Sequence, residues 1–588
     1  MRMRLFDKKW FFVLPAVLGT GFILMAVFAP GLGIDGNATW GGKRVLALIL
    51  GLSLLLFSAA VHWPRQQAQS AEERARVLRV RLVSLAAGVC TLLVIAAYVW
   101  IISLGRWSAW LTTSAYYDRL ATSFQHGRID IEAELDPALL QLPNPYDPEA
   151  RKQIRGLLDT RDMSLYNGKV YLYFGAGPAV LLAVLKYLYS GQIGDAGLTF
   201  AFLSGLFIFE ALLLLHIWRR FFSEAPGWTV VLGLLVIGLI HPVAWMLIKP
   251  RVYEVAIAAG QCFLAGGFFF ALAGLGRESK SVWRHLLAGS LWALAAGTRP
   301  TLAIPVVFLS IMVLYRMFRE HQDAGEMRSF ARAFAAMFVP LAVGAVTLCW
   351  YNWARFGSIF ETGFRYALAM LDLHEAQRGM FSPVHALPNL YVYFLNPPAL
   401  YDAFPFFRAV RAEAVIARFR HYSPLVYNAE RGTGILYYAP FMFLALIPAA
   451  YSLAMPFGKR KPSIDAGEAG SQQGLLKWTI LSLLGALALG LITLLSFYYA
   501  TVRYVMEITP FAVTLAMIGF WQGYLGLRRR KLLRALYELC VIGLAVASIL
   551  VSVTLAFSND ADWIRENNGS LLPQLVILFN TLRRAIGF

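Results

Sequence analysis

Long apolar runs recur along the whole chain, and they decide what it can fold into. The 588 residues are 58% hydrophobic, with a mean hydropathy of +0.58. Many runs are about 18 to 25 residues long, and a helix of that length crosses the roughly 30 Å hydrocarbon core of a bilayer. We therefore expect an all-α polytopic membrane protein. A soluble enzyme is excluded.

The runs predict about thirteen membrane-spanning helices. Between them, clusters of Lys and Arg all fall on one side of the membrane, which places the N-terminus in the cytoplasm. These loops account for the net charge of +19 and would attract membrane lipids, and no RNA-binding signature indicates a nucleic-acid partner. The expected spans are 10–30, 44–62, 82–104, 197–219, 227–247, 252–275, 285–298, 300–317, 333–351, 434–455, 477–497, 504–525 and 533–556.

The apolar stretch 171–190 does not fit this alternation. Counting it as a span would move every later basic cluster to the outside, so we expect it on the outer surface or only partly inserted. The chain then divides into an additional two-helix segment with a basic cytoplasmic loop, a membrane module with a first outer loop, a second outer loop, and a C-terminal module with an outer tail. These parts are 1–81, 82–351 with loop 105–196, 352–433, and 434–588.

The first outer loop carries polar residues that need a reason in so apolar a chain. Asp118 lies on an expected short helix, 114–125, whose aromatic face would rest on the bilayer. Lys169 lies near the end of the loop. A carboxylate just above the hydrocarbon is a candidate for chemistry, although a solvated loop acid is the common alternative.

A second acid, Glu254, begins an otherwise uncharged span. A carboxylate there is costly unless a cation or a hydrogen-bond donor meets it. Arg251 is one candidate partner, and a purely structural role at the positive end of the helix is another.

Two arginines at other span ends are candidate phosphate ligands. Arg299 separates apolar segments of about fourteen and eighteen residues, and irregular backbone at that depth should line a polar cavity. Pro300 would begin the next helix, so Arg299 would stand beside a positive helix end that suits phosphate, unless it only extends to the interface. Arg503, next to Tyr504, begins another span and has Glu507 four residues on, so those two could pair with each other.

The order of these features resembles the GT-C superfamily of polyprenyl-phosphate-sugar-dependent glycosyltransferases, such as the bacterial aminoarabinose and protein mannosyl transferases. The landmarks that carry the resemblance are Asp118 early in the first outer loop, Asn167-Gly168-Lys169 before Tyr171, Glu254 at the second outer turn, Thr298-Arg299-Pro300, and Arg503-Tyr504 before Pro510. The chain departs from the family where Arg119 follows Asp118, where Glu254 replaces a common Asp, and where 174–178 replaces Lys-Pro-Pro.

The resemblance implies a GT-C fold and transfer of a sugar from a polyprenyl phosphate carrier to a hydroxyl on a glycan, lipid or protein acceptor. The site would face the periplasm of a bacterial inner membrane. Asp118 would be the general base of an inverting displacement, and Glu254 would orient the acceptor. If a divalent cation such as Mg or Mn takes part, Asp118 and Glu254 would hold it. The residues expected on the lipid-phosphate side are Lys169, Arg251, Arg299, Arg503, Tyr504 and Tyr117.

Two other functions stay open. An O-antigen polymerase or ligase would rely on arginines of the second outer loop, namely Arg408, Arg411, Arg418 and Arg420. A lipid-linked sugar transporter would catalyse no covalent step, and it would more often show internal repeats and charges near the bilayer midplane.

Overall fold

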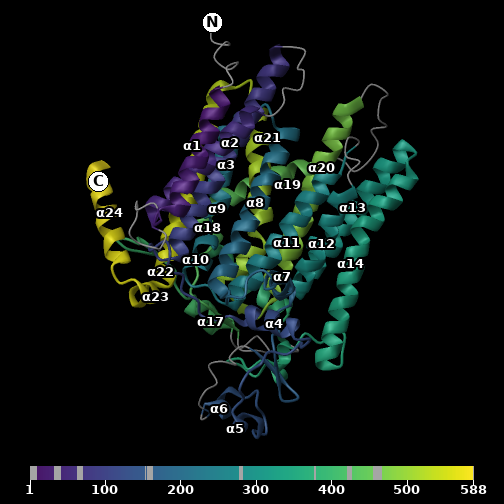
Figure 1. The fold of residues 1–588 in the computed structure, drawn as a ribbon, viewed down its shortest axis with the longest axis vertical. Coiled ribbons are helices and arrows are strands. Elements are labelled where there is room, and N and C mark those ends of the chain that lie inside the picture. Colours follow the sequence, from purple (N-terminus) through teal and green to yellow (C-terminus); the bar gives the residue numbers. More distant parts are fainter. Residues whose placement is uncertain are drawn as a thin grey trace.

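The protein is a bundle of long helices with short elements gathered at one end (Figure 1). The computed structural model describes residues 10–31, 41–62, 71–152, 154, 163–276, 282–376, 379–419, 427–454 and 467–586. Its longer helices are α1 (Trp10–Phe28), α2 (Gly42–His62), α3 (Ala71–Ile102), α8 (Asp195–Phe221), α9 (Trp228–Leu239), α11 (Val252–Gly274), α12 (Val282–Thr298), α13 (Ala303–Ala324), α14 (Met327–Phe356), α20 (Gly467–Ser496), α21 (Thr509–Gly526) and α22 (Lys531–Asn559).

The shorter helices connect or cover these long ones. They are α4 (Tyr116–Gln125), α5 (Pro137–Leu140), α6 (Pro148–Arg151), α7 (Gly177–Leu185), α10 (Val243–Ile248), α15 (Leu373–Ala376), α16 (Ala386–Leu390), α17 (Glu413–Phe419), α18 (Ile435–Tyr438), α19 (Leu446–Ala454), α23 (Ala561–Asn567) and α24 (Leu571–Ile586). Five short 3-10 helices are described: η3 (Pro300–Leu302), η4 (Phe364–Tyr366), η6 (Pro383–His385), η8 (Pro440–Ala445) and η10 (Val502–Glu507). The segment η7 (Tyr391–Leu395) is a π-helix.

The helical, multi-pass architecture expected from the sequence is confirmed, and every expected span falls on helical segments. Within the described residues, seven helices are long and apolar enough to cross a membrane, and several shorter apolar helices accompany them. The expected spans 227–247 and 504–525 are each interrupted, as α9 and α10 and as η10 and α21, whereas 300–317 continues without a break from η3 into α13. Interrupted helices expose unpaired backbone groups, which suits the lining of a polar site better than contact with lipid.

The apolar stretch 171–190 forms only the nine-residue helix α7. A helix of that length is about 13 Å long and cannot cross the roughly 30 Å hydrocarbon core. Val184, Tyr187 and Leu188 project from this stretch with most of their surface exposed. An apolar face without a protein partner fits the expected position at the outer membrane surface.

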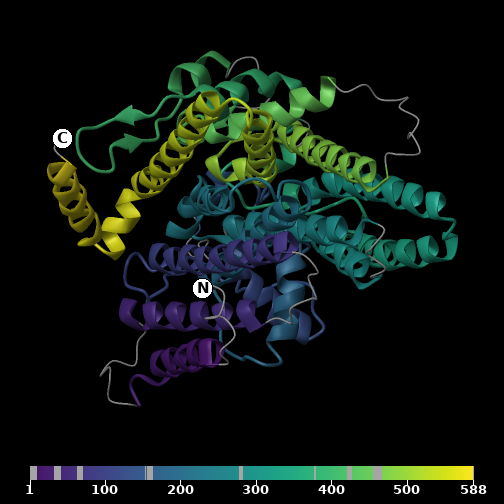
Figure 2. The same cartoon turned by 90° about the horizontal axis from the view of Figure 1, so that it is seen from above.

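The outer-loop elements gather at one end of the bundle, called the outer end below. α4, α5, α6 and α17 lie there, at the bottom of Figure 1, whereas the turn between α13 and α14 lies at the top. Seen from above, the early helices α1 to α3 form one side and the late helices α21 and α22 the other, with teal helices between them (Figure 2). Residues from distant parts of the sequence therefore meet in the middle.

Short strand pairs organise the outer loops. β1 (Ser164–Tyr166) and β2 (Lys169–Tyr171) form an antiparallel hairpin with Tyr166 opposite Lys169. Its turn uses Asn167 and Gly168, both with positive φ, as a two-residue hairpin turn requires. β3 (Ala399–Leu400) pairs antiparallel with β4 (Phe407–Arg408), and β5 (Asn428–Ala429) pairs parallel with β6 (Tyr499–Ala500). The β5–β6 pair joins the second outer loop to the segment before α21.

The expectation that the aromatic face of α4 rests on the bilayer is wrong. Tyr117 is fully buried, in a cluster with Val255 of α11 and Tyr351 of α14. The ring of Phe124 also packs edge-on against Tyr351. The amphipathic pattern of α4 therefore faces protein, and α4 covers the outer ends of the long helices.

Candidate active site at the outer end

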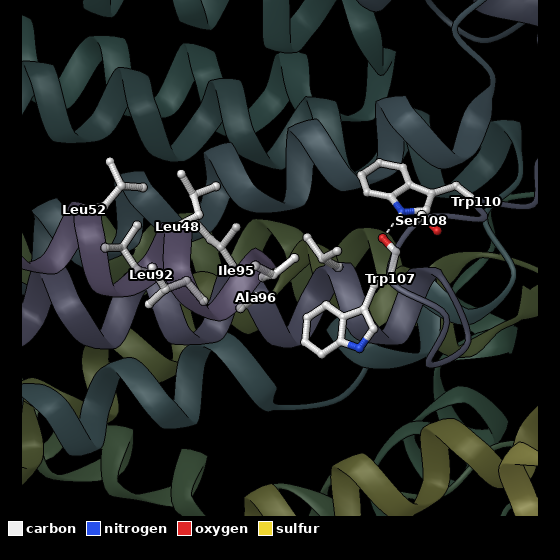
Figure 3. A pocket seen from close by; sticks show the side chains of 11 residues that line it. Leu48, Leu52, Leu92, Ile95, Ala96, Trp107, Ser108 and Trp110 are labelled. Carbon is white, nitrogen blue, oxygen red and sulfur yellow. Dashed lines mark hydrogen bonds between the residues drawn. The ribbon is translucent and has the colours of Figure 1, made fainter. Parts of the chain in front are cut away.

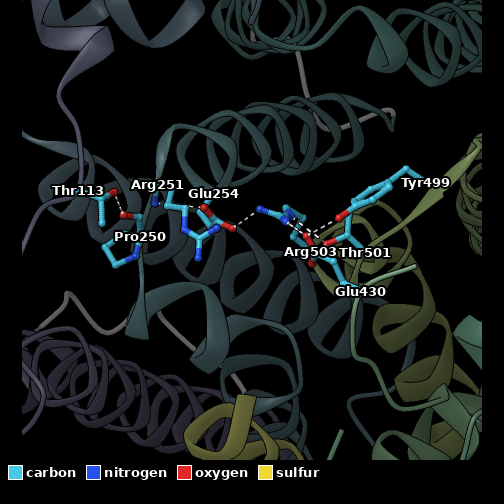
Figure 4. Close-up of polar contacts among 8 residues, drawn as sticks. All are labelled: Thr113, Pro250, Arg251, Glu254, Glu430, Tyr499, Thr501 and Arg503. Carbon is cyan, nitrogen blue, oxygen red and sulfur yellow. Dashed lines mark hydrogen bonds and ion pairs between the residues drawn. The ribbon is translucent and has the colours of Figure 1, made fainter. Parts of the chain in front are cut away.

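Glu254 lies in the first turn of α11 and is 1% exposed. Its Oε2 accepts a hydrogen bond from the backbone N–H of Arg251 at 3.1 Å, and its Oε1 pairs with Nη1 of Arg503 at 3.1 Å (Figure 4). The cation that meets this carboxylate therefore comes from a residue 249 positions away. Arg251 supplies its backbone amide to hold the same side chain.

Arg503 is the centre of a larger network. Its Nη2 pairs with Glu430, its Nε donates to Oγ1 of Thr501 at 2.9 Å, and its guanidinium carbon lies 4.9 Å from the ring centre of Tyr253. Burial alone lowers the pKa of Arg503, but Glu254 and Glu430 raise it by more, so the side chain stays protonated. The proposed pairing of Arg503 with Glu507 is wrong.

Glu430 was not found from the sequence. It accepts hydrogen bonds from Thr501 Oγ1 at 2.5 Å and from the Tyr499 hydroxyl at 3.3 Å, besides its pairing with Arg503. The parallel pairing of β5 and β6 brings this part of the second outer loop beside Thr501. No local pattern marks Glu430, because its importance depends on a contact across 73 residues.

Arg299 follows α12 and precedes η3, where the helix is interrupted. Its Nη2 pairs with Glu507, and its guanidinium carbon lies 5.7 Å from the ring centre of Tyr504. The side chain is 13% exposed within the protein, so it does not simply extend to the membrane interface. Its Nε is buried without a hydrogen-bond partner among the described residues, so one donor remains available for a ligand.

Asp118 of α4 is 5% exposed. Its Oδ1 accepts from the backbone N–H of Ile193 at 2.9 Å and pairs with Nζ of Lys186 at 3.0 Å. No hydrogen bond or ion pair between its Oδ2 and another described residue is found. Lys186 was not identified from the sequence. It lies in the apolar stretch that was expected at the outer membrane surface, where a lysine is common and does not indicate a functional site.

Tyr117 lies close enough to both Asp195 and Arg299 for their charges to act on its hydroxyl. Burial, and then the charge of Asp195, raise the pKa of Tyr117 well above its usual value, while Arg299 lowers it, so the phenol stays protonated. Asp195 begins α8, is fully buried, and accepts a hydrogen bond from the hydroxyl of Ser114 on one oxygen. Its other oxygen and the Tyr117 hydroxyl have no hydrogen-bond partner among the described residues. Asp195 was passed over because an acid at a helix start is an ordinary capping pattern.

The structure brings most of the expected residues together. Glu254, Arg251 and Arg503 are in direct contact, and η10 carries Arg503 and Tyr504 beside Arg299. Tyr117, on the same helix as Asp118, is close enough to Arg299 for that charge to lower the pKa of its phenol.

Lys169 lies apart from this cluster. It is exposed at the β1–β2 hairpin, where its charge acts on Asp130.

The arginines of the second outer loop have local partners. Arg408 stacks on Tyr401, with its guanidinium carbon 4.3 Å from the ring centre, and Arg411 pairs with Glu413 at 3.2 Å. Arg418 lies in the last turn of α17, and Arg420 is outside the described residues. None of the contacts found for the described members joins them to Glu254 or Arg299.

A divalent cation held by Asp118 and Glu254 does not fit this arrangement. Each carboxylate already pairs with a basic side chain, Lys186 or Arg503. Within the described part of the chain, no group of three or more His, Cys, Asp or Glu is placed to hold a metal ion. A metal at Glu254 would have to displace the ion pair with Arg503 or the hydrogen bond from the N–H of Arg251.

Comparison with known proteins gives matches in structure only. No protein-family model and no curated protein sequence matches the chain. The similar solved structures include the oligosaccharyltransferase AglB from Archaeoglobus fulgidus with an inhibitory peptide and a dolichol-phosphate, at 11% identity and a TM-score of 0.39 over 81% of this chain. They also include the Archaeoglobus fulgidus oligosaccharyltransferase in the apo form, at 13% identity and a TM-score of 0.43 over 82% of this chain, and with Zn and sulfate, at 14% identity and a TM-score of 0.42 over 79%.

The chain spans 53% to 58% of the length of these structures. They are described as oligosaccharyltransferases. All three TM-scores are below 0.5.

Proposed function

We propose that the protein transfers a sugar from a polyprenyl phosphate carrier to an acceptor hydroxyl at this outer-end site, on the periplasmic face of a bacterial inner membrane. One observation carries the proposal: Glu254, Arg299 and Arg503, which stand far apart in the sequence, converge in a buried cluster where the long helices begin. Buried charges are costly in a membrane protein and mark functional sites.

The arginines supply what a phosphate leaving group needs. As the bond to the sugar breaks, negative charge grows on the phosphate oxygen, and cations fixed in place stabilise that charge without reorganisation. Arg299 offers the unpartnered Nε, so a phosphate oxygen there would complete its hydrogen bonds. Arg503 is held by Glu254, Glu430 and Thr501, which fix its orientation.

Asp118 is the proposed general base. Lys186 and the N–H of Ile193 anchor Oδ1, which leaves Oδ2 to accept a proton. The acceptor oxygen bonds to the anomeric carbon, its proton passes to Asp118, and the carbon–phosphate-oxygen bond breaks with its electron pair left on the phosphate. A single displacement of this kind inverts the anomeric centre. Glu254 is the proposed positioning residue for the acceptor. Arg503 and the N–H of Arg251 hold its carboxylate in place.

Purified protein in lipid nanodiscs, given a panel of polyprenyl-phosphate sugars, tests this function. Asp118→Asn should lower kcat by about 10² to 10⁴, the usual contribution of a general base. Glu134→Gln, an exposed acid of the same loop, is the matched control and should keep full activity. Unchanged turnover in Asp118→Asn would rule out the assigned base.

The same assay separates the alternatives. A polymerase or ligase would lose activity in Arg411→Ala while tolerating Asp118→Asn. A transporter would move lipid-linked sugar between leaflets without forming a new glycosidic bond.

A further inference from the structure

A second feature lies away from the ion pairs, between α2 and α3. Aliphatic side chains from residues 45–52 of α2 and 92–99 of α3 line a groove of about 470 Å³ (Figure 3). On each helix the lining residues follow the spacing of one helical face. Residues 92–99 belong to the outer half of a membrane-spanning helix, Ala75–Ile102, so the groove lies in the outer part of the hydrocarbon layer.

The groove has one polar end. Trp107, Ser108 and Trp110 close it at the outer side, with the two indoles beyond the row of aliphatic side chains in Figure 3. The backbone of Trp107 is left-handed, with φ 69°, a conformation rare for a bulky residue. Strained residues concentrate at binding sites, where the surroundings hold them in place. Indoles are also the side chains that favour the boundary between hydrocarbon and water.

The shape and lining of the groove select its occupant. Water needs polar partners, which the aliphatic walls do not provide. A partner helix is about 10 Å wide, so 470 Å³ holds only about one turn of it. A single flexible hydrocarbon chain fits both the volume and the chemistry.

Two basic residues lie close to Trp107 at the polar end. Lys43 is exposed in the first turn of α2, next to Gly42, which lies against the Trp107 indole. Arg106, which precedes Trp107, is exposed and donates a hydrogen bond to the carbonyl of Asn567. Two positive charges at the mouth favour an anionic head group, such as a phosphate.

The mouth of the groove leads to the proposed base. The segment that follows Trp110 is fixed by a hydrogen bond from Thr113 to the carbonyl of Pro250 at 2.8 Å and by the bond from Ser114 to Asp195, and it then enters the helix of Asp118. A lipid held in this groove therefore has its head group at the start of the short segment that leads to Asp118.

We infer that the groove between α2 and α3 binds a hydrocarbon chain of the acceptor, so that the sugar acceptor is an anionic, phosphate-bearing glycolipid. This inference rests on the proposed function. It extends that function by naming the class of acceptor and by giving the added N-terminal helices a role in binding it.

A labelled lipid tests the groove without relying on turnover. The probe is a phosphorylated glycolipid with a diazirine in one acyl chain, incorporated into phosphatidylcholine nanodiscs with the full-length protein. After illumination, mass spectrometry should find the label on peptides 45–52 and 92–99, and unlabelled glycolipid, but not added phosphatidylcholine, should compete. Label spread evenly over the lipid-exposed helix faces, or no competition by the glycolipid, would overturn the inference.

Variants that fill the groove provide the second arm. Ala96→Trp should reduce groove labelling about tenfold and raise the KM for the lipid acceptor by a similar factor with kcat retained, the loss expected if about two methylene groups are kept out. Leu93→Trp, on an exposed position of the same helix, is the matched control and should change neither. Ala96→Phe is a smaller plug if the tryptophan variant does not fold.

Transfer to a water-soluble version of the acceptor, lacking the lipid chain, should be equal in wild type and Ala96→Trp. Equal KM values for the lipid acceptor in both proteins would also overturn the inference. If the groove is labelled but no polyprenyl-phosphate sugar is consumed, the proposed function fails and only a lipid site remains. If sugar is transferred but the groove is not labelled, the inference alone fails.

Discussion

Removing the Arg503 side chain should lower the free energy of unfolding strongly, because two carboxylates pair with it. Replacing it with methionine keeps much of its volume but leaves two carboxylates without their cation. The side chain of Glu254 is 2% exposed, so stranding its charge should cost about 3 to 5 kcal/mol. The side chain of Glu430 is 30% exposed, so water replaces part of what it loses and it adds about 1 kcal/mol or less.

A double-mutant cycle separates the ion pair from other effects of the substitutions. Glu254→Gln alone removes the charge but still accepts the N–H of Arg251, and Arg503 keeps Glu430, so we expect a loss of about 1 to 2 kcal/mol. In the double variant no unpaired carboxylate remains at position 254. The loss of stability in the double variant should therefore be about 2 kcal/mol smaller than the sum of the losses in the two single variants.

The measurement is the free energy of unfolding in detergent micelles with increasing fractions of sodium dodecyl sulfate, under conditions where refolding is complete. Arg565→Met, whose partner Asp562 is largely exposed, serves as the control and should change stability by less than about 1 kcal/mol. Additivity of the two site variants within about 0.5 kcal/mol would refute the idea that Glu254 depends on Arg503.

Three other predictions follow from contacts described above. Gly175→Ala should lower both the melting temperature and activity, because an added Cβ would overlap the backbone carbonyls of Gly297 and Thr298. Gly297→Ala, where an added Cβ meets open space, should change neither. Equal effects of the two substitutions would contradict this reasoning. Lys186→Met should lower kcat about a hundredfold by releasing the base while the KM for the donor is kept, and an unchanged kcat would count against the anchoring role. Lys169→Ala should keep kcat/KM within about threefold, since a solvated exposed charge contributes little, and a larger loss would restore the lysine as a phosphate ligand.

The helices and several site residues were predictable because their signals are local. Apolar runs of membrane length predict spans without knowledge of their neighbours. Glu254, Arg299 and Arg503 were found because a charge at the end of an apolar run is rare and calls for a partner. These three residues are brought together by the structure.

The partners themselves could not be predicted. Glu430 and Lys186 become important only through residues far away in the sequence, so nothing near them marks their roles. The alternative in which Arg503 pairs with Glu507 is not formed because this segment is a 3-10 helix, in which residues three apart, not four apart, lie on one face.

The face of α4 was wrongly assigned for a different reason. Hydrophobic periodicity shows that one side of a helix avoids water, but it does not distinguish lipid from protein as the covering. Tyr117 therefore had the same sequence signal whether it faced the bilayer or the core.

The ion pair between Glu254 and Arg503 also has a consequence for biosynthesis. Its two halves are 249 residues apart, so the first half is inserted into the membrane long before the second has been synthesised. Until η10 emerges, Glu254 lies at the end of a membrane helix without its counter-ion. The ribosome must therefore complete most of the chain before this ion pair can form, and a truncated product that ends before residue 499 retains most of the membrane-spanning helices but lacks the partner of Glu254.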